Sequence, residues 1–256
     1  MKRLLLVVVF ALALAAPAAQ AGEWQPDVGA AQAYARERRG TIAFHVRTPT
    51  RDWGWRASST FPSASVLKVM LMDAYLNQGS VRERALRASD RALLEPMIRR
   101  SDNAAANRII GIVGTRGLRR VARRARMERF TPALPIWGNS RVSPSDQTRY
   151  FLQIRSLLPE HHRSYGMSLL GSIVPSQRWG IGRVSLPGWQ VYFKGGWGSG
   201  TGAVAHQVAL LERDESSRVS VAVMTVDQGT HAYGKETLRG VFKRLLRGLP
   251  SEGAVP

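Results

Sequence analysis

The chain has 256 residues, of which 44% are hydrophobic, enough to bury a sizeable core in one large domain or two small ones. It contains no cysteine, which excludes a disulfide framework, a thiolate nucleophile and a cysteine-based metal or iron–sulfur site. The formal net charge of +19 at pH 7 favours association with polyanions.

Residues 1–21 resemble a secretory signal peptide. Lys2 and Arg3 precede an apolar, alanine-rich run that ends in the small-x-small sequence Ala19-Gln20-Ala21. We predict cleavage before Gly22 and a secreted protein that is extracellular, periplasmic or associated with the cell wall. The alternative is an uncleaved anchor, whereas a lipoprotein signal would need a cysteine. For an exported chain, anionic wall polymers and lipid head groups are expected as partners ahead of nucleic acid.

The first predicted elements after this segment are a helix and a hairpin. Residues 27–39 have a helical pattern that ends before Gly40, and the runs at 41–46 and 53–58 read as two short strands. From residue 63 to about residue 170 the apolar periodicity is helical, with breaks at glycine and proline. The middle third of the chain should therefore be an all-helical unit.

The pattern returns to strands near the C-terminus. Segments 189–194, 206–213 and 218–226 predict three antiparallel strands, and residues 234–248 predict a helix that packs on them.

We therefore expect an α/β (α+β) fold in which an antiparallel sheet is flanked by N- and C-terminal helices, with an all-helical subdomain inserted. Residues 22–256 would form one domain: a sheet subdomain over 24–62 plus 178–250, and a helical subdomain over 63–177. A cleft is expected where the two parts meet.

Lys68 is unusual in its surroundings. The helix around it, SASVLKVMLMDAYL, carries apolar residues in every direction, so Lys68 should be desolvated or should face a polar cleft. The chain uses arginine for almost all its positive charge, and a buried lysine, unlike an arginine, can lose its proton. Ser65 lies three residues earlier on the same helix face.

Such a pair suits a serine nucleophile with a lysine base, near helix N–H groups that stabilise an oxyanion. The alternatives are a lysine that reaches the surface and a motif that occurs by chance.

Two further motifs follow in order. Ser101-Asp102-Asn103 precedes an alanine-rich helix, and Lys194-Gly195-Gly196 ends a predicted strand. Taken singly, Ser101 could be an ordinary N-cap and Lys194 a charge at a strand end. The three motifs together, in this order and in these structural contexts, favour a catalytic site.

This ordered set resembles the superfamily of class A β-lactamases and penicillin-binding D,D-peptidases, whose signature is Ser-x-x-Lys, Ser-Asp-Asn and Lys-Thr-Gly. The likeness runs from about Asp27 to Leu249 and includes the sequences FPSAS, SDNAAAN and KGGWGSGTG.

The resemblance implies catalytic roles for Ser65 as acylating nucleophile, Lys68 as its base partner and Ser101 as proton relay to the leaving nitrogen. Asn103, Lys194, Gly196 and Trp197 would form the substrate-binding part. Asn103 would bind the substrate amide and Lys194 a carboxylate, and the backbone N–H groups of Ser65 and Trp197 would form the oxyanion hole. Such an enzyme requires no metal and no other cofactor, and the five histidines show no metal-ligand spacing. We expect a monomer.

Three departures from the family pattern stand out. The Glu-x-x-Leu-Asn loop that supplies the deacylating glutamate is absent: between Asn103 and Lys194 the carboxylates are Glu128, Asp146 and Glu160, in other contexts. The stretch from Ser65 to Ser101 is shorter than is usual. Gly195 replaces the hydroxyl-bearing residue of the third motif, and Trp197 is equally compatible with packing and with substrate contact.

The leading hypothesis is a secreted serine hydrolase that forms an acyl-enzyme with a β-lactam or a D-Ala-type peptide amide of peptidoglycan. One alternative keeps the fold without catalysis, as a cationic wall-binding protein. The other, suggested by charge alone, is a cationic membrane- or nucleic-acid-binding protein.

Overall fold

A computed structural model describes residues 24–198, 202–214 and 216–251. The predicted signal peptide and its cleavage site lie outside the described residues. Among the described residues, no helix has the length and apolar character needed to cross a membrane.

A five-stranded antiparallel sheet with the order β2-β1-β7-β6-β5 forms the centre of the molecule. Its strands are β1 (Thr41–Arg47), β2 (Asp52–Trp55), β5 (Gln190–Gly198), β6 (Val204–Glu212) and β7 (Arg218–Val226). Every residue of β6 is buried, as expected for a strand covered on both faces. The N-terminal hairpin thus joins the three C-terminal strands in one sheet, and β5 forms one of its edges.

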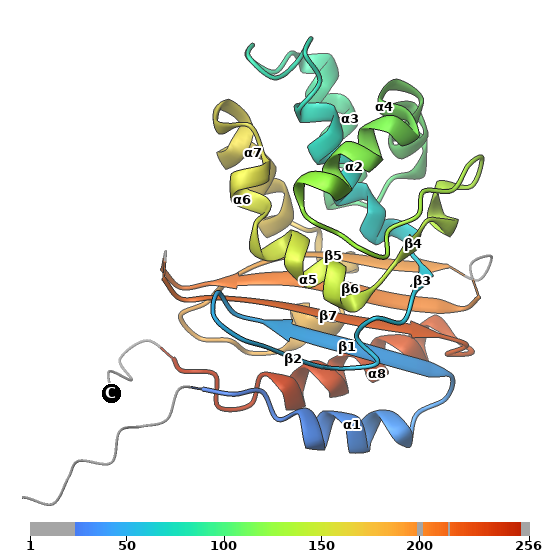
Figure 1. Cartoon of the computed structure of the whole chain (residues 1–256), viewed down its shortest axis with the longest axis vertical. Helices are drawn as coiled ribbons and strands as arrows, with labels where there is room; N and C mark the ends of the chain where they lie inside the picture. The colour runs from blue at the N-terminus through green and yellow to red at the C-terminus, as the bar shows by residue number, and fades with distance from the viewer. Residues whose placement is uncertain (1–23, 199–201, 215, 252–256) are drawn as a thin grey trace, which may run out of the picture.

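Two helices cover one face of the sheet, below it in Figure 1: α1 (Val28–Arg36) and α8 (His231–Leu245). Asp27 caps α1 by accepting a hydrogen bond from the backbone N–H of Ala30. In α8 the residues at helical spacing are fully buried: Leu238, Val241, Phe242 and Leu245. The sequence pattern therefore identified the face of this helix that packs on the sheet.

The other face carries the inserted helical part (Figure 1). Its helices are α2 (Leu67–Leu76), α3 (Ala88–Arg99), α4 (Asn103–Arg124), α5 (Pro144–Leu152), α6 (Ile154–Leu157) and α7 (Glu160–Gly171). All residues of α2 are buried, as its sequence predicts, so α2 is the central helix of this part. Helix α4 is interrupted at Gly114, whose φ is 59°.

The insertion also contains a short strand pairing. Strand β3 (Phe61–Pro62) pairs with β4 (Arg141–Val142), which lies within the region predicted to be all-helical. The backbone N–H of Ser63 also donates to the carbonyl of Ser140, at 2.7 Å. Two-residue strands have no periodicity that a sequence pattern could reveal. This pairing fixes the chain just before Ser65.

A buried carboxyl group lies at the centre of the insertion. Asp73 of α2 is fully buried and accepts hydrogen bonds from Asn77 at 2.7 Å and Tyr150 at 3.2 Å, with Arg124 at 3.5 Å. Burial raises the pKa of Asp73 to about 7, against the opposing effect of Arg124. The group therefore carries a proton more readily in the folded protein than in the unfolded chain.

We predict that Asp73 makes the protein less stable as the pH rises. Its pKa is higher in the folded state, so between pH 4 and pH 7 the folded state binds more protons and the stabilisation is lost with increasing pH. The unfolding free energy of Asp73→Asn minus that of the wild type should therefore increase by on the order of 2–4 kcal/mol between pH 4 and pH 7. Urea unfolding of both proteins at pH 4, 5.5 and 7 measures this difference, and a constant difference would contradict the prediction.

Candidate active site

Ser65 occupies a short turn between the sheet and the central helix. It is the middle residue of the 3₁₀ turn η1 (Ala64–Val66), which leads directly into α2. Ala64 has a positive φ of 43°, a conformation that is uncommon for residues other than glycine and is often retained at functional sites. Ser65 is partly exposed, and its Oγ has no hydrogen-bond partner among the described residues. Its hydroxyl is thus accessible.

Lys68 is completely buried one turn further along. Its amine donates hydrogen bonds to Asn103 Oδ1 at 2.7 Å, to Ser101 Oγ at 3.2 Å and to the Ser101 carbonyl. Burial lowers its pKa from 10.5 to about 7, while Asp102 acts weakly in the other direction. The expected desolvation is present, but the amine contacts the Ser101–Asn103 segment and makes no hydrogen bond to Ser65.

The Ser101 hydroxyl lies between two lysines. Its Oγ accepts from Lys68 Nζ at 3.2 Å and from Lys194 Nζ at 3.0 Å. Ser101 has a φ of 63°, and the N-cap of α4 is Asp102, which accepts from the N–H of Ala105. The simple N-cap alternative for Ser101 is therefore wrong, and its hydroxyl is available to the two amines.

Lys194 reaches this point from strand β5. Its side chain is buried, and its amine also donates to the carbonyl of Gly195, at 2.7 Å. Burial lowers its pKa well below the usual value, and the positive charge of Lys68 lowers it further. Two buried amines this close repel each other when both are charged, which favours a neutral form for one of them near pH 7.

Gly196 allows β5 to approach the turn that carries Ser65. A Cβ at this position would lie 2.8 Å from the backbone nitrogen of Ser65 and 2.9 Å from that of Val66. A larger residue would push the strand and the turn apart. The backbone of the third motif is therefore directly beside the N–H group of Ser65.

The place of the missing hydroxyl is filled by an indole. A Cβ at Gly195 would lie 2.6 Å from the ring of Trp179, a buried residue between α7 and β5. Trp179 packs edge-on against His231, with ring centroids 5.2 Å apart. Sequence reasoning did not identify Trp179, which is distant from the motif in the chain.

Trp197 extends this aromatic group to the surface. Its ring stacks on His231 at a centroid distance of 4.5 Å, and half of the residue remains exposed. Burial lowers the pKa of His231 to about 4, with a further contribution from Lys235, so this imidazole is neutral at pH 7. Trp197 thus packs on a neighbour and still offers an exposed face, which keeps both of its predicted roles open.

Two other residues position the site without having been predicted to do so. His206 is buried on β6, accepts from the N–H of Thr225 at 3.0 Å and donates to the carbonyl of Pro62 at 2.8 Å. Burial lowers its pKa to about 4, so the neutral ring holds the segment before Ser65. Trp137 lies with its ring centroid 5.2 Å from the Lys68 amine and donates to Asn107 at 2.7 Å.

The three carboxylates considered as bases for the deacylating water make no hydrogen bond to the candidate catalytic residues. Glu128 is exposed and pairs with Arg149 at 2.8 Å. Asp146 accepts the backbone N–H groups of Glu128 and Arg129, and Glu160 lies in the first turn of α7. In the part of the chain that the structure describes, none of them hydrogen-bonds Ser65, Lys68 or Ser101, and no cluster of metal-binding side chains occurs.

The sequence and the fold were compared with those of known proteins. The model of a family described as the β-lactamase enzyme family matches residues 79–246, which include Ser101, Asn103 and Lys194 but begin after Lys68. No curated protein matches the sequence.

Among solved structures, the β-lactamase from Sphaerobacter thermophilus DSM 20745 is similar at a TM-score of 0.73 and 22% identity, covering 88% of this chain and 97% of that one. An ancestral class A β-lactamase has a TM-score of 0.72 at 17% identity, with 86% and 98% coverage. A β-lactamase from Xanthomonas campestris pv. campestris str. ATCC 33913 has a TM-score of 0.73 at 16% identity, with 86% and 95% coverage. These identities establish a shared fold. Together with the family match over more than half of the sequence, they show that the chain belongs to the β-lactamase enzyme family.

Proposed function

We propose that the protein is a secreted serine hydrolase that forms an acyl-enzyme through Ser65 with a β-lactam or a D-Ala-type amide of a wall peptide. The observation that carries this proposal is the position of Ser101 Oγ, within 3.2 Å of Lys68 and 3.0 Å of Lys194, where Lys68 follows the partly exposed Ser65 by three residues. Residues from three separate motifs thus meet at one point. Family membership supports hydrolase chemistry in general.

In the proposed acylation step, neutral Lys68 takes the proton of Ser65 as its Oγ attacks the carbonyl carbon. The oxyanion accepts hydrogen bonds from the backbone N–H groups of Ser65 and Trp197. As the C–N bond breaks, Ser101 delivers its proton to the leaving nitrogen and regains one from Lys68. The Lys194 amine supplies hydrogen-bond donors at this point, and Lys68, once it is protonated, supplies positive charge that stabilises negative charge on the substrate.

Deacylation is expected to be slow. A water molecule that attacks the ester needs a base, and none of Glu128, Asp146 and Glu160 hydrogen-bonds Ser65, Lys68 or Ser101. The loop that contains Trp137 places an indole beside Lys68. These features favour a long-lived acyl-enzyme, as in a penicillin-binding protein, over rapid antibiotic hydrolysis.

A second candidate, a catalytically impaired cationic wall-binding protein on the same fold, is favoured by one observation. Trp179 fills the space of the third-motif hydroxyl, which removes a contact expected for a substrate carboxylate. The two candidates differ in whether any β-lactam or ester acylates Ser65.

The first test is intact mass measured over time after addition of a penicillin or a chromogenic cephalosporin. We expect one persistent adduct per chain, absent in Ser65→Ala and present in the matched control Ser59→Ala, which changes an exposed serine. Rapid loss of the chromophore would overturn slow deacylation. Absence of an adduct with every β-lactam and ester would select the wall-binding candidate.

The rate of acylation should depend on the protonation of Lys68. With a pKa lowered to about 7, its neutral fraction rises roughly ninety-fold between pH 5 and pH 8 and then levels off. Lys68→Arg should abolish acylation, because arginine stays protonated. Stopped-flow acylation rates from pH 5 to pH 9 check this. An acylation rate that does not change with pH would contradict the role of Lys68 as base. A pH-dependence that is lost in Lys194→Gln would also contradict it, because Lys194 would then be the titrating group.

A further inference from the structure

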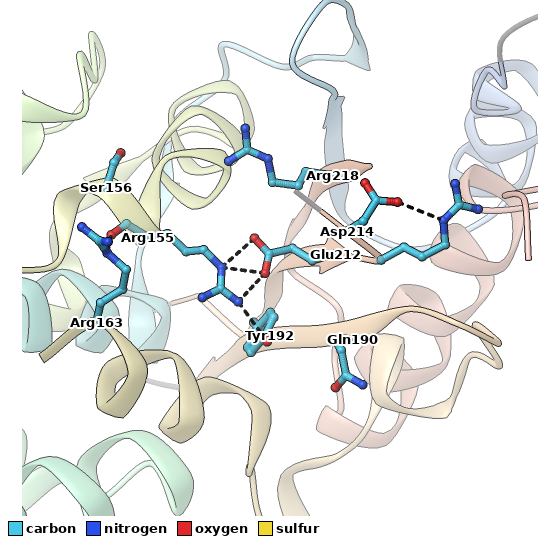
Figure 2. Close-up of a pocket in the computed structure, with 9 residues that line it drawn as sticks. Arg155, Ser156, Arg163, Gln190, Tyr192, Glu212, Asp214 and Arg218 are labelled. Carbon is cyan, nitrogen blue, oxygen red and sulfur yellow. Dashed lines mark hydrogen bonds and ion pairs between the residues drawn. The ribbon is translucent and has the colours of Figure 1, made fainter. Parts of the chain in front are cut away.

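A cavity lies away from the candidate active site, where β5 begins and β6 ends, next to α6 and α7. Its volume is about 670 Å³, within the range of small-molecule sites. Figure 2 shows the side chains that matter for its chemistry: Arg155, Arg163, Gln190, Tyr192, Glu212 and Arg218. None of the residues proposed for catalysis lines it.

One arginine of the cavity is held rigidly. Arg155 Nε donates to both oxygens of Glu212, at 2.9 and 2.7 Å, and its Nη2 donates to the Tyr192 hydroxyl at 3.1 Å (Figure 2). The Glu212 side chain is 10% exposed and the Arg155 side chain 38%, so the carboxylate end of this charge-assisted pair is the buried one. The guanidinium of Arg155 is therefore fixed in orientation and its charge is compensated.

Two further arginines face the same cavity without a carboxylate partner among the described residues. Arg163 donates through Nε to the carbonyl of Arg155 at 2.7 Å, which leaves its two terminal nitrogens for other acceptors. The side chain of Arg218 makes no hydrogen bond or ion pair with a described residue, and its Nε is buried without a partner. Buried donors without acceptors are uncommon in folded proteins. The Arg155–Glu212 ion pair is sufficient to connect α6 with β6, and this connection does not require Arg163 or Arg218.

The charged side chains that line the cavity carry more positive than negative charge. Glu212 compensates Arg155, and Asp214 lies 3.6 Å from Arg213. Hydrogen bonds from Ser216 and Ser217 hold the pKa of Asp214 below its usual range, so it is charged at pH 7. Among the lining residues that the structure describes, Arg163 and Arg218 remain, with two uncompensated positive charges. A phosphate monoester has a charge of about −1.5 to −2 at pH 7 and three acceptor oxygens, which suit planar guanidinium groups.

We propose that this cavity binds a phosphate monoester carried on a sugar or polyol, with the phosphate held by the guanidinium groups that line the cavity, Arg163 and Arg218 among them. The cavity is larger than a phosphate alone requires, and the Gln190 amide and the Tyr192 hydroxyl supply polar groups for hydroxyls of the attached body. The site is independent of acylation at Ser65. The monoester can come from a free sugar phosphate or from a phosphorylated end of a wall polymer.

The test is isothermal titration calorimetry with glucose 6-phosphate, inorganic phosphate, unphosphorylated glucose and a poly(glycerol phosphate) chain, in about 0.15 M NaCl to screen non-specific attraction. We expect saturable binding of glucose 6-phosphate, weaker binding of inorganic phosphate and none of glucose. Arg163→Gln and Arg218→Gln should each weaken glucose 6-phosphate at least about tenfold. Arg119→Gln, an exposed arginine of α4, is the matched control for loss of charge and should bind as wild type does.

Several outcomes would overturn the proposal: no saturable binding by the wild type, equal affinities in the two variants and the control, or binding of the phosphodiester chain alone. If glucose 6-phosphate bound at Lys68 and Lys194 instead, the Arg163→Gln and Arg218→Gln variants would bind it as the wild type does, which would also contradict the proposal. Arg163→Lys, which keeps the charge and loses the fork, should give an intermediate affinity. Penicillin acylation, where it occurs in the wild type, should be unchanged in every variant, so that failure of the two proposals is distinguishable.

Discussion

The burial of two lysine amines around one serine hydroxyl is the constraint on which the site depends. Lys68 comes from a helix that is buried on all sides, Lys194 from an edge strand, and Ser101 from the chain just before α4. Desolvating two positive charges this close is unfavourable unless acceptors surround them. The Ser101 carbonyl, the Asn103 amide and the Gly195 carbonyl provide those acceptors, so the positions of three elements are set together.

The sheet and the helical insertion form a support for this arrangement. His206 holds the chain before Ser65 from strand β6 of the sheet, and the pairing of β3 with β4 holds it from the insertion. Gly196 lets the edge strand come close to the same turn. Each contact is made by backbone or by a neutral ring, which adds no further charge to a region that already contains two amines.

The sequence alone predicted the elements whose signal is periodic. The buried helix around Lys68, the apolar face of α8 and the three C-terminal strands have such patterns, and the ordered motifs predicted which residues would be close to one another. The family match and the shared fold confirm the class of protein. The catalytic roles of Ser65, Lys68 and Ser101 stay predictions, because proximity does not measure reactivity.

Trp179, Trp137 and His206 could not be predicted, because their roles arise from contacts between segments that are distant in sequence. The contact of Trp179 with Gly195 also bears on how this site can change. A hydroxyl-bearing residue at position 195 would collide with the indole, while a smaller residue at 179 alone would leave a void beside His231. Each of the two substitutions is unfavourable alone, whereas both together are sterically compatible, so positions 179 and 195 are expected to be epistatic. A lineage that carries this pair is therefore separated from the threonine-containing form of the motif by a barrier that one substitution does not cross.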